Sequence, residues 1–289
     1  MTFSPSPRPW PPPGWYADPW RAGPWRWWDG YRWTGYVVTP VGTPSVATST
    51  PPPRGPGIKG GGIAAVGIGL GLAGSIAVVI AFAVNSSGHF DVRNPWYLLA
   101  SQSALWAGMV GATVVASWRN GSRSLARDYG LSWPKRGDLW TGVVGGVLGR
   151  LPPTFVLVLI VWANRGFNAP NSAGRQINGF TPEGTAGWIV VTSIAVLGAP
   201  VIEELFFRGL VQGAFTRRIG AVPAIFVTAL IFSAAHLLNE GPFAPYVLFP
   251  AAVVLGYLRY RYGRLAPGMV AHGTFNALAF ALFLVPAFR

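Results

Sequence analysis

Hydrophobic residues in this 289-residue chain are gathered into long runs that begin only near residue 62. Runs of about 17 to 25 apolar residues have the length that an α-helix needs to cross a bilayer. The pattern therefore predicts an all-α polytopic membrane helix bundle of about seven or eight transmembrane helices. The predicted spans are Gly62–Val84, Trp96–Ser117, Asp138–Ala163, Trp188–Arg208 with a continuation, Ala221–Leu238, Tyr246–Leu258 and Pro267–Val285.

Composition and charge agree with a membrane protein. Hydrophobic residues make up 51% of the chain, charged residues make up 11%, and the mean hydropathy is +0.38, a profile of polytopic membrane proteins rather than soluble domains. The net charge of +13 comes mostly from arginine, and Lys and Arg cluster in alternate connections between the runs. This distribution predicts an integral, multi-pass plasma-membrane protein with a cytoplasmic N-terminus, whose surroundings are the lipid bilayer and not a nucleic acid.

The first 60 residues differ in composition from the rest. Residues 1–40 are rich in Trp, Pro and Gly, and residues 41–60 form a Pro/Thr/Gly-rich linker that is expected to be disordered and flexible. We therefore expect a Trp-rich β mini-domain at 1–40, the linker at 41–60, and a multi-pass transmembrane domain at 61–289.

The mini-domain carries the signal of a β-hairpin. In WRWWDGYRWTGYVV, Asp29 and Gly30 separate two aromatic arms, which predicts a two-residue turn, and the preceding GWYADP segment is expected to pack its rings on the hairpin. Residues 12–38 resemble a short domain of unknown function found at the N-termini of many actinobacterial membrane proteins. Such a unit could bind a peptide or a lipid surface, and the simpler interpretation is a small folded cap.

A few ionisable residues fall deep inside the apolar runs, where burial is costly and each is a candidate for function. Taken singly, each also fits a structural role. These residues are Arg150, Glu203, Glu204, Arg208, His236 and His272.

Spacing gives these residues different roles. Glu204 and Arg208 are four residues apart, so on a helix they share a face and can form an ion pair, while Glu203 points about 100° away and stays available as a base. Measured along the helices from Arg217 and Ala221, Glu204 and His236 lie about 20 and 22 Å deep.

The HGTFN segment adds a second polar face. His272 and Asn276 are also four residues apart, and measured from Ala266 they lie about 9 and 15 Å deep. The sequence therefore predicts that three helices bring polar groups together inside the bundle.

Three segments, EELFFR, FSAAH and HGTFN, match in order and separation the motifs of the CPBP family of intramembrane proteases. This family includes the type II CAAX prenyl endopeptidases and the bacteriocin-processing or abortive-infection proteins, and the resemblance covers roughly residues 95–285. It implies an endopeptidase that hydrolyses a peptide bond of a membrane-associated protein or peptide. The implied catalytic roles are water activation by Glu203 and His236, oxyanion stabilisation by His272 and Asn276, and positioning by Glu204 and Arg208.

Two alternatives stay open at this point. Glu203, His236 and His272 could ligate zinc with an open water position, although the chain has no HExxH segment and no cysteine, and a metal-free glutamate mechanism explains the same residues. Buried Glu, His and Arg are also typical of a non-proteolytic membrane protein, such as a proton-coupled transporter or a scaffold with a polar core.

Arg150 is not explained by the three motifs. It lies directly before Leu151-Pro152-Pro153, near the middle of a predicted span. We expect its guanidinium to donate to backbone carbonyls freed by the two prolines rather than to Glu203, and a later start of the span would instead place it at the surface.

Overall fold

The computed structural model describes residues 14–18, 24–28, 33–38, 59–85, 94–163, 184–237 and 244–283. The chain divides into two compact units, Met1–Arg54 and Gly55–Arg289, and each is described by itself.

The N-terminal unit contains a three-stranded antiparallel sheet. Its strands are β1 (Gly14–Ala17), β2 (Trp25–Trp28) and β3 (Trp33–Val38), in the order β1-β2-β3. The pairing of β2 with β3 confirms the predicted hairpin, whereas its Asp29-Gly30 turn lies outside the described residues.

The segment before the hairpin is itself a strand. Trp15 lies opposite Trp27 in the register between β1 and β2, so the GWYADP segment does more than pack its rings on the hairpin. A two-stranded ribbon is marginally stable in water, and a third strand satisfies more backbone groups. The predicted hairpin is thus part of a three-stranded sheet.

The second unit is helical, and each predicted span is largely helical over its described part, with a turn at His236 after α9. The helices are α1 (Lys59–Asn85), α2 (Pro95–Asn120), α3 (Leu125–Tyr129), α4 (Arg136–Ala163), α6 (Gly184–Thr192), η1 (Ser193–Gly198), α7 (Ala199–Glu203), η2 (Glu204–Val211), α8 (Gln212–Ile219), α9 (Ala221–Ala235), α11 (Ala244–Tyr262) and α12 (Ala266–Phe283).

Within the described residues, three helical stretches are long and apolar enough to cross a membrane: Gly60–Asn85, Pro95–Asn120 and Gly184–Ile219. They support a multi-pass membrane protein. The count of about seven transmembrane helices stays a prediction, because α9, for example, has only the 15 residues Ala221–Ala235. The cytoplasmic position of the N-terminus also stays a prediction.

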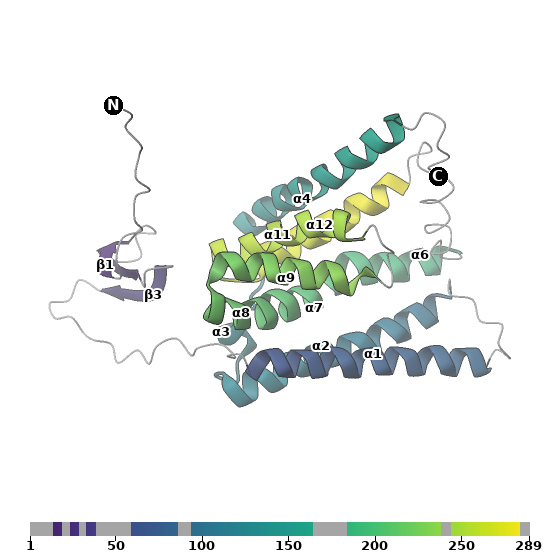
Figure 1. Ribbon diagram of the computed structural model, residues 1–289, viewed down its shortest axis with the longest axis horizontal. Coiled ribbons are helices and arrows are strands. Elements are labelled where there is room, and N and C mark those ends of the chain that lie inside the picture. The colour runs from purple at the N-terminus through teal and green to yellow at the C-terminus, as the bar shows by residue number, and fades with distance from the viewer. Residues whose placement is uncertain are drawn as a thin grey trace, which may run out of the picture. The chain divides into compact units, whose positions relative to one another are not determined.

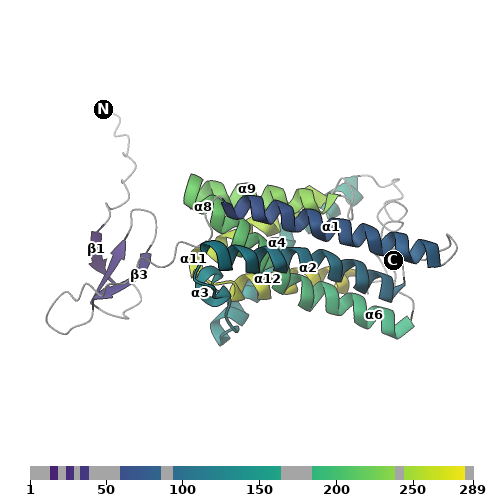
Figure 2. The same cartoon turned by 90° about the horizontal axis from the view of Figure 1, so that it is seen from below.

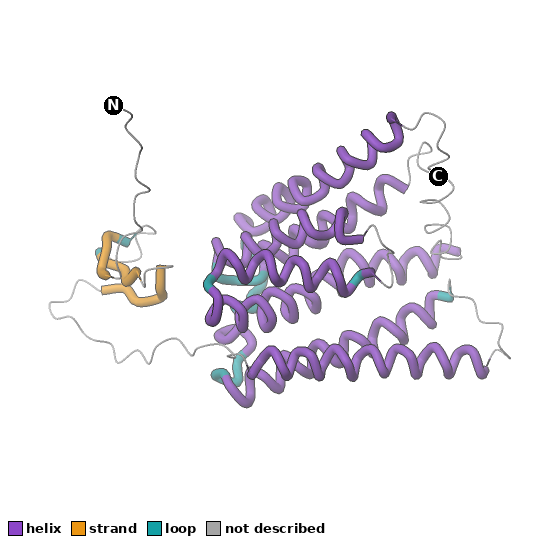
Figure 3. The backbone as a smooth tube through the Cα atoms, viewed as in Figure 1, coloured by secondary structure: helices purple, strands orange, loops and turns teal. Residues whose placement is uncertain are grey.

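Figures 1 and 2 show how the helices are arranged. Helices α1 and α2 form an antiparallel pair, and α4, α11 and α12 pack together as a second group. The long segment from α6 to α8 contacts both groups and therefore lies between them. Figure 3 colours the helices of this unit purple and the strands of the N-terminal unit orange.

Small residues allow α1 and α2 to approach closely. A Cβ atom added to Gly108 would overlap the carbonyl oxygen of Gly67 and would lie 2.7 Å from the backbone nitrogen of Gly71. Small residues at four-residue spacing are the usual means by which membrane helices pack backbone against backbone. This close contact, the α1–α2 seam, holds together the two helices that flank the central segment.

Gly108→Ala should lower the free energy of unfolding by about 1–3 kcal/mol, because the added methyl group overpacks this seam. Thermal unfolding of the purified protein in detergent measures the effect. Gly111→Ala is the matched control on the same helix, since a Cβ there meets nothing within 4 Å. Equal shifts in the two variants would contradict the close α1–α2 contact.

The central segment from α6 to α8 was expected to be a continuous α-helix, and the structure differs. It contains two π-helical stretches, η1 and η2. The amide of Ala199 donates to the carbonyl of Ile194, and the amide of Gln212 donates to the carbonyl of Phe207, each five residues back. Pro200 lacks an amide hydrogen, so it cannot supply the α-helical bond of the turn before it. Wide turns of this kind occur frequently at functional sites.

The helix ends at the basic side of the bundle lie at different levels. The amide of Leu265, just before α12, donates to the carbonyl of Gly130 after α3. Gly209 packs against Tyr129 of the same α3 turn, with a Cβ there 3.2 Å from the tyrosine Cβ. Gly209 of η2 therefore lies beside the start of α12, and α8 continues beyond it. Arg217 and the start of α12 therefore do not mark one common level, and the predicted depths, which were measured from them, stay predictions.

Candidate active site

Glu204 and Arg208, both on η2, form a buried ion pair, as the spacing predicted. Arg208 Nη1 lies 3.0 Å from Glu204 Oε1, and each residue is 1% exposed. The guanidinium also donates from Nη2 to the carbonyl of Ala252 on α11 and lies 4.5 Å from the centroid of the Phe232 ring. Because a buried ion pair is stable only with further hydrogen bonds, these contacts explain how the charges are accommodated.

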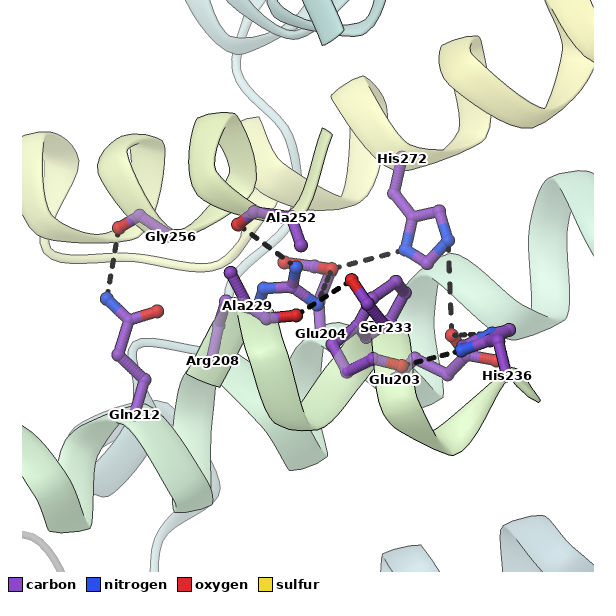
Figure 4. Close-up of polar contacts among 11 residues, drawn as sticks. Glu203, Glu204, Arg208, Gln212, Ala229, Ser233, His236, Ala252, Gly256 and His272 are labelled. Atoms are coloured by element: carbon purple, nitrogen blue, oxygen red, sulfur yellow. Dashed lines mark hydrogen bonds and ion pairs between the residues drawn. The ribbon is translucent and has the colours of Figure 1, made fainter. Parts of the chain in front are cut away.

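The adjacent carboxylate of Glu203 has different neighbours. Its Oε2 lies 3.9 Å from His236 Nε2 and 4.0 Å from His272 Nε2. Figure 4 draws the contacts among these residues as dashed lines. Glu203 is 9% exposed, and Oε2 is buried without a hydrogen-bond partner in the described part of the chain. These separations exceed a direct hydrogen bond and suit a bridging water. The two adjacent glutamates thus have different partners, one in an ion pair and one near two imidazoles.

The hydrogen bonds of the two histidines fix which ring nitrogen faces Glu203. His236 lies just after the last residue of α9, and its Nδ1 is 2.8 Å from the carbonyl oxygen of Phe232, which can only accept. His272 Nδ1 is 3.2 Å from Glu204 Oε1, an acceptor held in its ion pair. Each Nδ1 therefore carries a hydrogen, and in the neutral ring each Nε2 presents a lone pair. Both Nε2 atoms face Glu203.

The contact between His272 and Glu204 was not foreseen from the sequence. It makes Glu204 a partner of both Arg208 and His272. Gly268 on α12 makes room for this arrangement, because a Cβ there would lie 2.9 Å from Glu204 Oε2. In the sequence, the one sign of this contact was the spacing of Gly268 and His272, which are four residues apart and share one helical face.

Asn276 reaches η1 rather than the glutamates. Its Nδ2 donates to the carbonyl of Ala195 over 2.7 Å. In an α-helix that carbonyl would accept from Ala199, but here the Ala199 amide donates to Ile194. The π-helical turn therefore frees a carbonyl, and Asn276 satisfies it. Sequence reasoning could not find this partner because it lies 81 residues away and depends on the wide turn.

Gln212 is a polar contributor that the sequence analysis did not single out. It lies four residues after Arg208, is 3% exposed, and donates from Nε2 to the carbonyl of Gly256 over 3.0 Å. Arg208 and Gln212 thus bind α11 through Ala252 and Gly256, one turn apart. A glutamine four residues after a buried arginine in an apolar run was the available signal.

Arg150 makes a contact with an aromatic ring on α12 that its position in the sequence did not predict. Its guanidinium carbon lies 4.9 Å from the centroid of the Phe275 ring on α12, and the residue is half-buried. Phe275 precedes Asn276 and lies one turn after His272, so Arg150 packs beside the helix that carries the third motif. The expectation that it donates to carbonyls freed by the prolines stays a prediction.

The zinc alternative can be compared with this geometry. Glu203, His236 and His272 converge and include ligand types that zinc accepts. In the described residues, however, no three His, Cys, Asp or Glu side chains have the spacing of a metal site. With zinc–ligand distances of about 2.0–2.2 Å, the ligand atoms of a tetrahedral ion lie about 3.3–3.6 Å apart, whereas Glu203 Oε2 lies 3.9 and 4.0 Å from the two Nε2 atoms. The arrangement therefore does not fit zinc.

Comparison with known proteins gives one match. Residues 185–278 match a family described as Rce1-like, type II CAAX prenyl endopeptidase. All six motif residues fall inside this range, namely Glu203, Glu204, Arg208, His236, His272 and Asn276. Neither the curated proteins nor the solved structures include a significant match to the chain.

Proposed function

Since residues 185–278 form a domain of the Rce1-like type II CAAX prenyl endopeptidase family, we propose that the chain is an intramembrane endopeptidase. Its substrate would be a membrane-associated protein or peptide. The observation that carries the proposal is the Glu203 carboxylate, which is buried and whose Oε2 lies about 4 Å from the Nε2 atoms of two imidazoles.

Glu203 and His236 are suited to activate a water molecule. A water between Oε2 and His236 Nε2 donates a hydrogen to each acceptor, which leaves its oxygen lone pair to attack the peptide carbonyl. Glu203 takes the proton as the new C–O bond forms. The protonated Glu203 then gives that proton to the leaving amine as the C–N bond breaks.

The negative charge that develops on the carbonyl oxygen needs donors. Asn276 has two amide hydrogens, and the one not used on Ala195 is available to an oxyanion. His272 donates from Nε2 only when both ring nitrogens are protonated, and in either form its contact with Glu204 holds the ring in place. Glu204 and Arg208 then act as positioning residues.

Proteolysis is tested by comparing the termini of membrane peptides from cells that express the chain with those from cells that express Glu203→Gln. We expect new termini only with the unchanged chain, at positions within or next to hydrophobic segments. An identical set of termini in both samples would overturn the proposal, provided that both proteins are present in equal amounts in the membrane.

Turnover should not depend on a bound metal, because the described side chains do not have the spacing of a zinc site. Purified protein treated with a zinc chelator, then freed of the chelator, is expected to keep its rate of peptide cleavage. His236→Ala serves as a loss-of-activity control in the same assay. Inactivation by the chelator that is reversed by added zinc would contradict the metal-free mechanism.

A further inference from the structure

The three-stranded sheet presents tryptophans on one face. The register pairs Trp15 with Trp27 and Ala17 with Trp25, and paired residues lie on the same face of a sheet. We call these four residues the indole face. Trp15 and Trp25 are 46% and 50% exposed, while Trp28, on the opposite face, is 6% exposed. Large apolar rings therefore point outward from one side of the sheet.

The opposite face is held by polar contacts. Arg26 donates from Nε to Asp18 Oδ1 over 2.7 Å and from Nη2 to Asp18 Oδ2 over 3.2 Å. On the indole face, Trp15 and Trp27 pack edge to face with centroids 5.4 Å apart. These contacts order the strands from both sides, so the exposed rings belong to a preformed surface.

The length of the connection keeps this surface near a bilayer. Val38 ends β3 and Lys59 begins α1, so residues 39–58 join them, which is 58 − 38 = 20 residues. A chain of this length spans at most about 70 Å even when fully extended. Because α1 is long and apolar enough to cross a membrane, the indole face always lies within that distance of a bilayer surface. A tether of this kind raises the local concentration of a weak contact.

The charge of this part of the chain is also suited to a membrane surface. Residues 1–59 contain six basic and two acidic side chains, a balance of 6 − 2 = +4. The basic ones are Arg8, Arg21, Arg26, Arg32, Arg54 and Lys59, and the acidic ones are Asp18 and Asp29. Basic segments next to a membrane are attracted to anionic lipids, and Trp rings favour the level of the lipid headgroups.

We propose that the indole face docks on the headgroup region of an anionic bilayer, on the side where α1 begins. Two exposed indole rings on a preordered sheet match a planar interface, with the ring bodies toward the acyl boundary and the ring N–H groups toward water. This contact is separate from the site at Glu203 and does not depend on proteolysis.

The chain contains no cysteine, so a single introduced thiol reports on one position. Ala17→Cys places an environment-sensitive dye on the indole face without removing a ring. The full-length protein is reconstituted into nanodiscs of phosphatidylglycerol or phosphatidylcholine that contain a nitroxide-headgroup lipid. We expect severalfold stronger quenching in phosphatidylglycerol, and a decrease when the salt concentration is raised.

Pro24→Cys is the matched control, because Pro24 is exposed and strand alternation places it on the opposite face from Trp25. Its dye should be quenched weakly in both lipids. Trp25→Ser in the Ala17→Cys background should reduce quenching at position 17 toward that of the control. Equal quenching at positions 17 and 24, or none at position 17 in phosphatidylglycerol, would overturn the proposal. The proposal would also be overturned if a soluble peptide of residues 48–56 displaced the dye from the lipid, because that result would assign the indole face to a proline-rich ligand.

Discussion

Glu203→Gln is expected to abolish turnover while the protein stays folded. The amide that replaces the carboxylate cannot accept a proton from the attacking water, and a general base contributes typically 10²–10⁴-fold to a rate. Glu203 is not part of the Glu204–Arg208 ion pair, so its neutralisation leaves that pair intact. The rate of cleavage of a membrane peptide and the thermal unfolding midpoint, measured on one preparation, test both parts of the expectation.

The same variant separates a protease from a transporter with a polar core. If Glu203→Gln left cleavage unchanged and instead altered proton flux in proteoliposomes, the buried carboxylate would belong to a transport pathway. If cleavage were lost and the unfolding midpoint fell as much as in a variant of the ion pair, Glu203 would have a structural role.

Glu204→Gln should destabilise the protein by about 3–5 kcal/mol, the usual cost of removing one partner from a buried ion pair. The change leaves the Arg208 guanidinium, 1% exposed, without its carboxylate, and it replaces the acceptor of His272 Nδ1. Thermal or denaturant unfolding in detergent measures the loss. Glu203→Gln is the matched control, because the same chemical change is made one residue earlier.

A second variant distinguishes loss of charge balance from loss of shape. Glu204→Gln combined with Arg208→Met removes both charges, and replacing a whole buried pair with residues of similar volume is often close to neutral. We expect this double variant to regain most of the stability lost in Glu204→Gln. Equal stability and equal residual activity in the two single glutamate variants would refute the division of roles between Glu203 and Glu204.

Local spacing was sufficient to predict the helices and the ion pair. A run of apolar residues sets a helix of a given length, and four-residue spacing places Glu204 and Arg208 on one face. The helices and the ion pair depend on short stretches of chain, so the sequence contains them directly. The convergence of Glu203, His236 and His272 joins distant segments, and it was expected from positions along the helices and from the resemblance rather than from local spacing.

Features that depend on contacts between distant segments could not be predicted. The level of one helix end relative to another is set by contacts such as that between Gly130 and Leu265, which no periodicity encodes. The bond from His272 to Glu204 and the bond from Asn276 to Ala195 likewise join residues 68 and 81 positions apart. The third strand of the N-terminal sheet was missed because GWYADP is too short to show clear alternation.

The wide turn at Ser193–Gly198 determines the direction in which the glutamates point. One residue advances a helix by about 100° around its axis, so an α-helical register in this turn would rotate everything after it by about that angle. Glu203 would then turn away from His236 and His272. Asn276 holds the carbonyl that the wide turn releases, and Pro200 cannot supply the amide that an α-helical turn requires. Asn276 on α12 thus stabilises the wide turn and, through it, the direction in which the carboxylates of Glu203 and Glu204 point.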